Sequence, residues 1–268
     1  TGVWGDLKRI PSEVDVPVTI VAGQFDHHEE GTILGYERLR PEIRAKSRLI
    51  LGSWNHSFQP TPNHVQMTHA RDFNTTVDQF EWFYGLLVEE KEPVHEIRAY
   101  VIEDDRWVNL DEWPLRTKKE KVMYLSSQKA SDQAYVLSGN RERKKSRLTY
   151  QYDPANPVYA TGGETIFTTT GRRGSHLQPE MGSREDVLSF VTEPLESDLA
   201  IAGAVKVMLK VSTDVDDTCF AFTLSEVTPE GKAYNMRTSI ATLGYRDGLL
   251  KPRVSYTPGE VVELEVEA

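Results

Sequence analysis

Hydrophobic residues in the first third of the chain form short continuous runs separated by a segment of helical spacing. Residues 16–22 are mostly apolar and β-branched and end at Gly23, and residues 47–51 form a second such run that ends at Gly52. A strand that is apolar on both faces is typical of a parallel sheet covered by helices. Between the runs, residues 29–40 carry hydrophobic side chains at roughly helical spacing. This order of strand, helix and strand predicts a right-handed crossover and a parallel sheet.

A longer helix is predicted at residues 75–88, where hydrophobic side chains recur on one side. These side chains are Val77, Phe80, Phe83, Tyr84 and Leu87. Their spacing is that of an amphipathic helix. Together with the preceding strands, this helix makes the first part of the chain an α/β region.

The pattern changes after Pro93, where helical spacing gives way to short alternating segments. The predicted strands cover residues 97–101, 121–125, 187–191, 205–211, 219–227 and 261–266. Repeated short strands separated by Gly, Pro, Asp and Asn are typical of an antiparallel sandwich or a jelly roll. We therefore predict an α/β plus all-β fold, with an α/β domain at 1–92 and a β-sandwich at 93–268.

The charge balance argues against one class of function. The 268 residues contain 31 Lys and Arg against 41 Asp and Glu, a net charge of −10, whereas general nucleic-acid binding depends on cations that contact phosphate. No stretch approaches the roughly 20 apolar residues of a membrane helix. A single cysteine, Cys219, excludes a disulfide within the chain. We expect no nucleic-acid or membrane partner and a cytoplasmic location, with a secreted precursor trimmed before Thr1 as the alternative.

Polar side chains follow the two predicted strands of the first region. Asp26 comes shortly after the first strand, and His56 shortly after the second. Because catalytic side chains gather beyond the carboxyl ends of parallel strands, these two residues can meet. A carboxylate that holds a histidine is the acid and base of a nucleophilic triad, in the chain order of α/β-hydrolases. The alternative is that both residues have only a structural role, since such residues are common at strand ends.

Residues 26–30 read Asp-His-His-Glu-Glu and raise the possibility of a metal site, because imidazoles and carboxylates bind zinc and iron. However, adjacent residues rarely face one ion, and no His-Glu-x-x-His spacing is present. We predict no metal site here. The simpler interpretation is a loop that leads into a helix, where Glu29 and Glu30 interact favourably with the helix dipole.

Several segments resemble the CocE/NonD hydrolases, a family of esterases, acylases and Xaa-Pro dipeptidyl-peptidases. In the first region, residues 16–26 and 49–56 resemble the acid and histidine segments of that family. In the second region, residues 152–163, 184–203 and 217–231 resemble segments of its C-terminal jelly-roll domain. One departure lies at residues 52–56, which read Gly-Ser-Trp-Asn-His, whereas the family usually has Gly-Pro-Trp-x-His. That change affects loop stiffness more than chemistry.

The resemblance implies a serine hydrolase of small esters, amides or peptides that needs no metal or organic cofactor. It assigns Asp26 as the triad acid and His56 as the general base. Phe25 and Trp54 are the candidate substrate-pocket residues, with core packing as the alternative for Trp54. It also implies that the chain is the C-terminal part of an α/β-hydrolase domain followed by a galactose-binding-like jelly roll.

The sequence contains no candidate for the nucleophile. A serine hydrolase carries its serine in Gly-x-Ser-x-Gly, and no serine here has glycine two residues to each side. The chain thus resembles the later part of a longer hydrolase, and the family has further strands after residue 266. We expect little or no hydrolase activity from the chain alone, and a companion chain or a homo-oligomer that completes it. The alternatives are a non-enzymatic jelly roll that binds sugar or peptide, and an interaction subunit.

Overall fold

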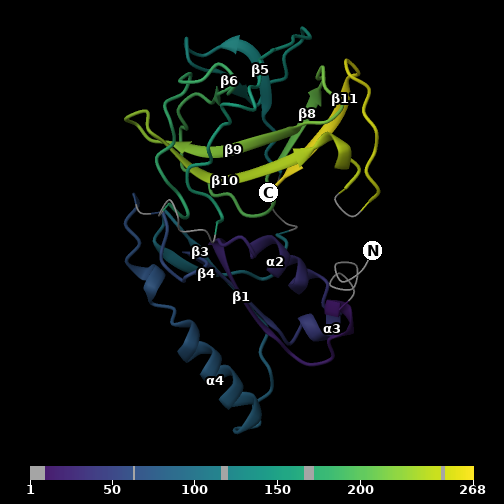
Figure 1. The fold of residues 1–268 in the computed structure, drawn as a ribbon. Helices are drawn as coiled ribbons and strands as arrows, with labels where there is room; N and C mark the ends of the chain where they lie inside the picture. Colours follow the sequence, from purple (N-terminus) through teal and green to yellow (C-terminus); the bar gives the residue numbers. More distant parts are fainter. Residues whose placement is uncertain (1–9, 63, 116–119, 166–171, 249–250) are drawn as a thin grey trace.

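The structure is a computed structural model and describes residues 10–62, 64–115, 120–165, 172–248 and 251–268. Among the described residues, more are in β-strands than in helices. Figure 1 shows two stacked parts, with the C-terminus at their junction and helix α4 (Thr75–Leu87) projecting from the far end of the lower part. Within the described residues, no helix combines the length and the apolar character needed to cross a bilayer.

One sheet organises the lower part. Its strands lie in the order β1 (Thr19–Phe25), β2 (Arg48–Asn55), β3 (Glu96–Val101) and β4 (Arg106–Asn109). β1, β2 and β3 are parallel, and β4 is antiparallel to β3. Helices α2 (Glu29–Glu37) and α3 (Pro41–Arg44) connect β1 to β2, and α4 lies between β2 and β3. The predicted strand, helix, strand order and the parallel pairing of its two strands are confirmed.

The core of the lower part lies between this sheet and helices α2 and α3. Every residue of β2 is buried, which explains its continuous hydrophobic run, because a central parallel strand has no face toward water. The buried cluster combines β-strand and helix side chains, namely Ala22, Tyr36, Leu39, Ile43, Leu49, Leu51 and Ile97.

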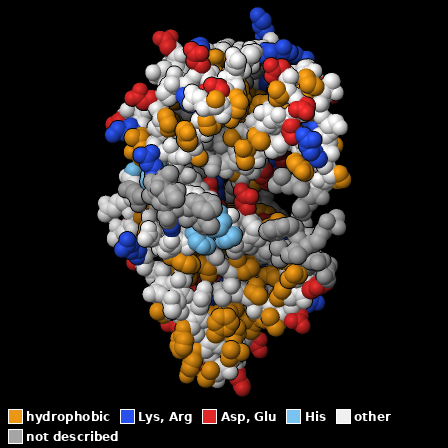
Figure 2. Space-filling view, in the orientation of Figure 1, with side chains coloured by type: hydrophobic (Ala, Val, Ile, Leu, Met, Phe, Trp, Pro, Cys, Tyr) orange, Lys and Arg blue, Asp and Glu red, His pale blue; other side chains and the backbone are white. Residues whose placement is uncertain are grey.

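Helix α4 forms where it is predicted, but its hydrophobic side is exposed. Phe80 is 66% exposed and Leu87 is 76% exposed, although an amphipathic helix in a globular protein normally turns this side toward a core. Figure 2 shows the resulting hydrophobic surface at the end of the molecule where α4 projects. The helix is held instead by Arg48 of β2, whose Nη2 lies 2.5 Å from Oδ1 of Asp78 and whose guanidinium stacks 5.0 Å from the ring centre of Trp82.

The sheet of the lower part continues beyond the predicted division at residue 92. Residues 97–101 are predicted as part of the sandwich, and this assignment is wrong, because β3 pairs in parallel with β2. Alternating hydrophobicity indicates a strand but does not specify which sheet the strand joins. β4, which the hydrophobic pattern did not predict, extends the same sheet. The division into domains 1–92 and 93–268 itself stays a prediction.

The upper part consists of three small sheets. They are β5 (Tyr124–Lys129), β6 (Tyr135–Ser138) and β7 (Phe190–Val191) in one sheet, β8 (Lys206–Val211) with β11 (Val262–Glu267) in a second, and β9 (Cys219–Val227) with β10 (Ala233–Thr242) in a third. The last two sheets pack on one cluster, in which Leu264 is buried and against which the partly buried Leu209 and Phe222 lie. Pairing in this part is not purely antiparallel as predicted, because β6 and β7 run parallel. The jelly-roll topology stays a prediction.

Buried polar groups join the two parts close to the end of β2. Asn235 of β10 is fully buried, and its Oδ1 accepts hydrogen bonds from the backbone N–H of His176 at 2.8 Å and from Nε2 of Gln178 at 2.9 Å. The backbone N–H of Ser175 donates to Oγ1 of Thr61 at 3.2 Å. Because buried polar groups that lose their partners are costly, the bond between Ser175 and Thr61 fixes the loop after β2 against the upper part.

Candidate active site

The structure brings Asp26 and His56 into contact. Phe25, at the end of β1, pairs with Asn55, at the end of β2, so the residues that follow leave the sheet side by side. Nδ1 of His56 lies 3.1 Å from Oδ2 and 3.2 Å from Oδ1 of Asp26. The geometry is that of a carboxylate that holds an imidazole through one ring nitrogen, while the catalytic roles of the two residues stay predictions.

A tight turn positions Asp26. Its backbone N–H donates to the carbonyl of Gly23 at 2.9 Å, and its Oδ1 accepts from the backbone N–H of His28 at 2.9 Å. A side-chain oxygen that bonds a backbone N–H two residues on is the standard way for Asp to stabilise a turn. This turn leads directly into α2, so the carboxylate is fixed between a strand and a helix.

The loop that carries His56 is held from two directions. Oδ1 of buried Asn55 accepts from the backbone N–H of Ser57 at 2.9 Å and of Gln59 at 3.4 Å. Nη1 of Arg173 donates to Oγ of Ser57 at 2.5 Å. No sequence pattern indicates the contact of Arg173 with Ser57, because the two residues lie 116 positions apart.

The contact determines which ring nitrogen of His56 is available. A carboxylate accepts a hydrogen bond from Nδ1, so the neutral ring carries its proton there and its lone pair on Nε2. The side chain is 45% exposed, which leaves Nε2 accessible to an incoming hydroxyl group. The arrangement can therefore accept a proton at Nε2 and stabilise the resulting imidazolium through Asp26.

Two further histidines lie against this pair. The ring centres of His27 and His28 are 3.7 Å apart, and that of His27 is 4.7 Å from that of His56. Nδ1 of His27 lies 3.1 Å from Oδ1 of Asp26. Burial, followed by the neighbouring imidazole of His28, lowers the pKa of the His27 side chain, while Asp26 acts in the opposite direction. Adjacent residues rarely face one place, but the rings of His27 and His28 do.

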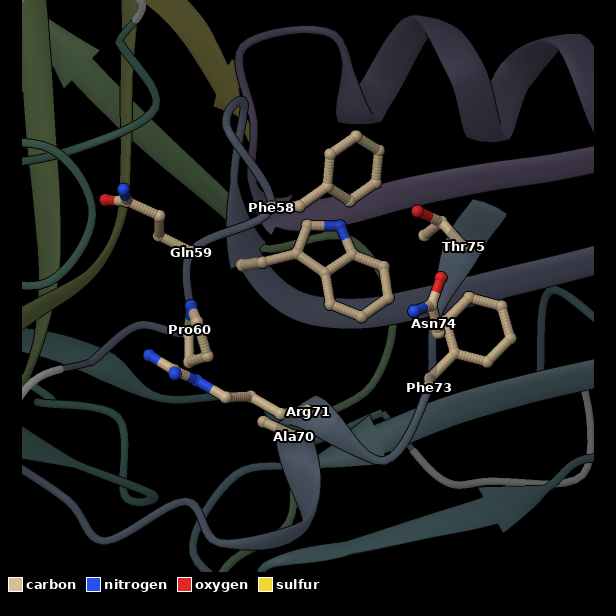
Figure 3. Close-up of a pocket in the computed structure, with 9 residues that line it drawn as sticks. Phe58, Gln59, Pro60, Ala70, Arg71, Phe73, Asn74 and Thr75 are labelled. Carbon is tan, nitrogen blue, oxygen red and sulfur yellow. The ribbon is translucent and has the colours of Figure 1, made fainter. Parts of the chain in front are cut away.

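Trp54 lines a cavity of about 420 Å³ beside the loop of His56. The indole is 3% exposed and packs against Phe58 and Phe73 at ring-centre distances of 5.7 and 5.9 Å. Figure 3 shows these two phenylalanines with Arg71 around the cavity. The two alternatives for Trp54 thus coexist, because its ring is packed in an aromatic cluster and also borders a space that an apolar group could fill.

Phe25 occupies a different environment from Trp54. It is 3% exposed and is not among the residues that line this cavity or a second one of about 310 Å³ bordered by Phe73, Arg98 and Trp107. In the described part of the chain, Phe25 therefore borders neither cavity. Its assignment to a substrate pocket stays a prediction that the cavities do not support.

Two paired glycines make room for the Trp54 indole. Gly23 of β1 lies opposite Gly52 of β2, and a methyl group on either would overlap the Trp54 ring. We expect Gly52→Ala to lower the free energy of unfolding by about 1–3 kcal/mol, because overpacking forces side chains from their rotamers. Urea unfolding followed by circular dichroism measures this loss.

Gly31→Ala is the matched control for this substitution. Gly31 lies in α2, and a methyl group there would meet no atom within 4 Å. Because glycine inside a helix is unfavourable, this change should leave the stability unchanged or raise it by up to about 1 kcal/mol. Equal losses in both variants would contradict the packing described for Trp54.

A charged cluster links the loop of Asp26 to the upper part. Arg237 of β10 forms ion pairs with Glu29 and with Glu164, and its Nη1 donates to the carbonyl of Gln24 at 2.8 Å. Burial raises the pKa of Glu29 to about 7, although the guanidinium of Arg237 acts in the opposite direction. The sequence could not reveal this cluster, since Arg237 lies 213 positions from Gln24.

The amino-acid sequence of the chain is similar to those of known proteins. The family model of the X-Pro dipeptidyl-peptidase C-terminal non-catalytic domain matches residues 87–268, more than half of the chain. The chain belongs to this family. This member of the X-Pro dipeptidyl-peptidase C-terminal family is 28% identical over 261 residues to the cocaine esterase of Rhodococcus sp.. The predicted resemblance to the CocE/NonD serine hydrolases is therefore confirmed.

The match to cocaine esterase covers 94% of this chain but 45% of that protein. Two mycobacterial proteins named as serine esterases, from Mycobacterium bovis and Mycobacterium tuberculosis, are 23% identical over 198 residues, or 69% of this chain and 29% of each protein. The chain thus spans less than half of the length of these curated relatives.

Proposed function

We propose that this chain supplies the acid and base of a serine hydrolase that cleaves acyl ester or amide bonds. The observation that carries the proposal is the contact of 3.1 Å between Oδ2 of Asp26 and Nδ1 of His56 at the ends of adjacent strands, in a member of a serine hydrolase family. His56 takes the proton of the attacking serine and delivers it to the leaving group, while Asp26 orients the ring and stabilises its charge.

The nucleophile in this proposal comes from polypeptide outside the 268 residues, in the same chain or in another. The sequence contains no Gly-x-Ser-x-Gly, and the relatives named as esterases are more than twice as long as the region they share with this chain. In the same proposal, β1 to β3 with their helices are the C-terminal part of an α/β-hydrolase sheet, and the upper part is the jelly roll.

The exposed hydrophobic side of α4 supports this arrangement. Phe80, Phe83 and Leu87 are all exposed on one helix, and a continuous apolar surface of this kind marks an interaction site. The polypeptide that carries the serine would cover this surface and extend the sheet. Nε2 of the exposed His56 is then available to that serine.

The cavity beside Trp54 is the proposed site for the apolar part of the acyl group. Its lining combines the aromatic rings of Trp54, Phe58 and Phe73 with polar Gln59, Arg71 and Asn74, and such a combination is typical of a site for a small organic ligand. The substrate class is small esters or amides, with peptides that have proline in second position as a further candidate.

The test compares two forms of the protein in the presence of a chelator. The 268-residue chain is produced alone, and the native form is purified through a C-terminal tag from its own cells with all polypeptide that accompanies it. Hydrolysis of nitrophenyl esters and aminoacyl-prolyl amides is measured for both. The proposal predicts turnover by the native form and little or none by the chain alone. Turnover by the chain alone, or by neither form, would contradict it.

The description of the matched family as a non-catalytic domain favours a second function for the upper part. That function is ligand binding or assembly, independent of Asp26 and His56. Loss of peptide or sugar binding on removal of residues 1–90 would count against it.

A further inference from the structure

We propose that His27, His28 and His56 form a binding site for a divalent transition-metal cation, for which Zn²⁺ is the reference ion. One ring nitrogen from each of the three residues lies within 4.8 Å of the others. All three residues are exposed, so a hydrated ion can reach them. Figure 2 shows histidine side chains gathered on the surface near the junction of the two parts.

The local backbone explains why two adjacent histidines face the same place. His27 and His28 lie in the turn that the Asp26 side chain closes, and this turn brings their ring centres within 3.7 Å of each other. His56 arrives from the neighbouring strand, with ring-centre distances of 4.7 Å to His27 and 5.5 Å to His28. The cluster therefore combines the turn after β1 with the loop after β2, so that three imidazoles face one place where an isolated His-His pair offers two.

The distances are close to those of a bound site. Zinc–nitrogen bonds of about 2.0–2.1 Å in a tetrahedral site place the ligand atoms about 3.4 Å apart. Exposed histidines need only small side-chain rotations to pass from separations of up to 4.8 Å to this value. Three imidazoles favour zinc, copper or nickel over calcium or magnesium, which prefer oxygen ligands. Three protein ligands also leave the fourth position of the ion for water.

Asp26 prepares two of the three rings for metal binding. Its carboxylate contacts Nδ1 of His27 at 3.1 Å and Nδ1 of His56 at 3.1 Å. A carboxylate on one ring nitrogen sets the tautomer and makes the other nitrogen a better ligand, as in many protein zinc sites. The lone pairs of both rings are thereby directed to Nε2.

The site shares His56 with the proposed triad, which gives the ion a definite effect. One lone pair on Nε2 cannot bind a cation and accept a serine proton at once. In this inference the cation is an inhibitor of the hydrolase rather than its cofactor. Binding itself does not depend on the proposed function, because it requires only the described histidines.

The test is isothermal titration of the full 268-residue chain with Zn²⁺ after removal of metals by a chelator. We expect one Zn²⁺ per chain, and at least tenfold weaker binding in His28→Ala and in His27→Ala. Asp26→Asn should weaken binding about 10- to 100-fold, because it removes the partner of two ligands. Circular dichroism verifies that each variant is folded.

His69→Ala is the matched control, since His69 is also exposed and its Nδ1 also contacts a carboxylate, that of Asp72, at 2.6 Å. This variant should bind Zn²⁺ as the unmodified chain does. Absence of saturable binding at one ion per chain, or equal affinity in His28→Ala and His69→Ala, would overturn the inference. Zn²⁺ binding by the chain, combined with an absence of hydrolase activity in the native form of the protein, would refute the proposed function but leave this site intact.

Discussion

Replacing His56 with alanine in the native form of the protein is expected to lower kcat/KM for a nitrophenyl ester by about four to six orders of magnitude, if the proposed function holds. In the proposed mechanism, this variant lacks the group that takes the proton of the serine. His56 and His27 both contact the carboxylate of Asp26, each through Nδ1 at 3.1 Å, so His27 is the alternative base to test. Asp26→Asn should lower kcat/KM by about four orders of magnitude, since it leaves the ring in place but favours the wrong tautomer.

His69→Ala is the control for these measurements, because it removes another exposed histidine that contacts a carboxylate. Its kcat/KM should equal that of the unmodified protein. His27→Ala tests whether the second imidazole on Asp26 can serve as the base. A loss in His27→Ala that equals the loss in His56→Ala would contradict the assignment of His56.

Replacing Arg237 with methionine is expected to lower the free energy of unfolding by about 3–5 kcal/mol at pH 8. Removal of Arg237 leaves the buried carboxylate of Glu29 and the partly buried one of Glu164 without a counter-charge. The loss should be smaller at pH 5, where Glu29 can be neutral. Chemical unfolding at both pH values measures the difference.

The sign of this pH dependence follows from the pKa of Glu29. Burial raises that pKa from 4.5 to about 7, so between these values the folded chain holds a proton that the unfolded chain releases. The contribution of Glu29 to stability therefore falls as the pH rises through this window. Without Arg237 the pKa rises further, and the loss grows at pH 8.

Glu29→Gln in the Arg237→Met background is the matched test of this explanation. Glutamine has nearly the same shape but carries no charge, so the double variant should recover most of the stability lost at pH 8. Equal losses of Arg237→Met at pH 5 and pH 8, or no recovery in the double variant, would show that the buried charge of Glu29 is not the cause.

The local elements of the lower part could be predicted because their signals are local. A run that is apolar on both faces indicated β1 and β2, and helical spacing indicated α2 and α4. The meeting of Asp26 and His56 followed from one geometric rule, that adjacent parallel strands end at the same edge of a sheet. The pairing of β1 with β2 is the one contact between distant residues on which these inferences depended.

The features that could not be predicted depend on long-range pairing or on what covers a surface. Residues 96–101 have the alternation of a sandwich strand but join the parallel sheet. The apolar stripe of α4 gave no indication that it is exposed in this structure. Contacts of Arg237 with Gln24 and of Arg173 with Ser57 join residues more than one hundred positions apart, and single-sequence patterns carry no information about such pairs.

The most direct test of the central claim is to identify the serine that a fluorophosphonate labels in the native form of the protein. The label reports a serine activated by a neighbouring base, and mass spectrometry of the digested protein locates it. The account predicts one labelled serine, outside these 268 residues and within Gly-x-Ser-x-Gly, whose labelling is lost in His56→Ala. A label on a serine within these residues, such as Ser57 beside His56, or labelling that persists in His56→Ala, would contradict the account.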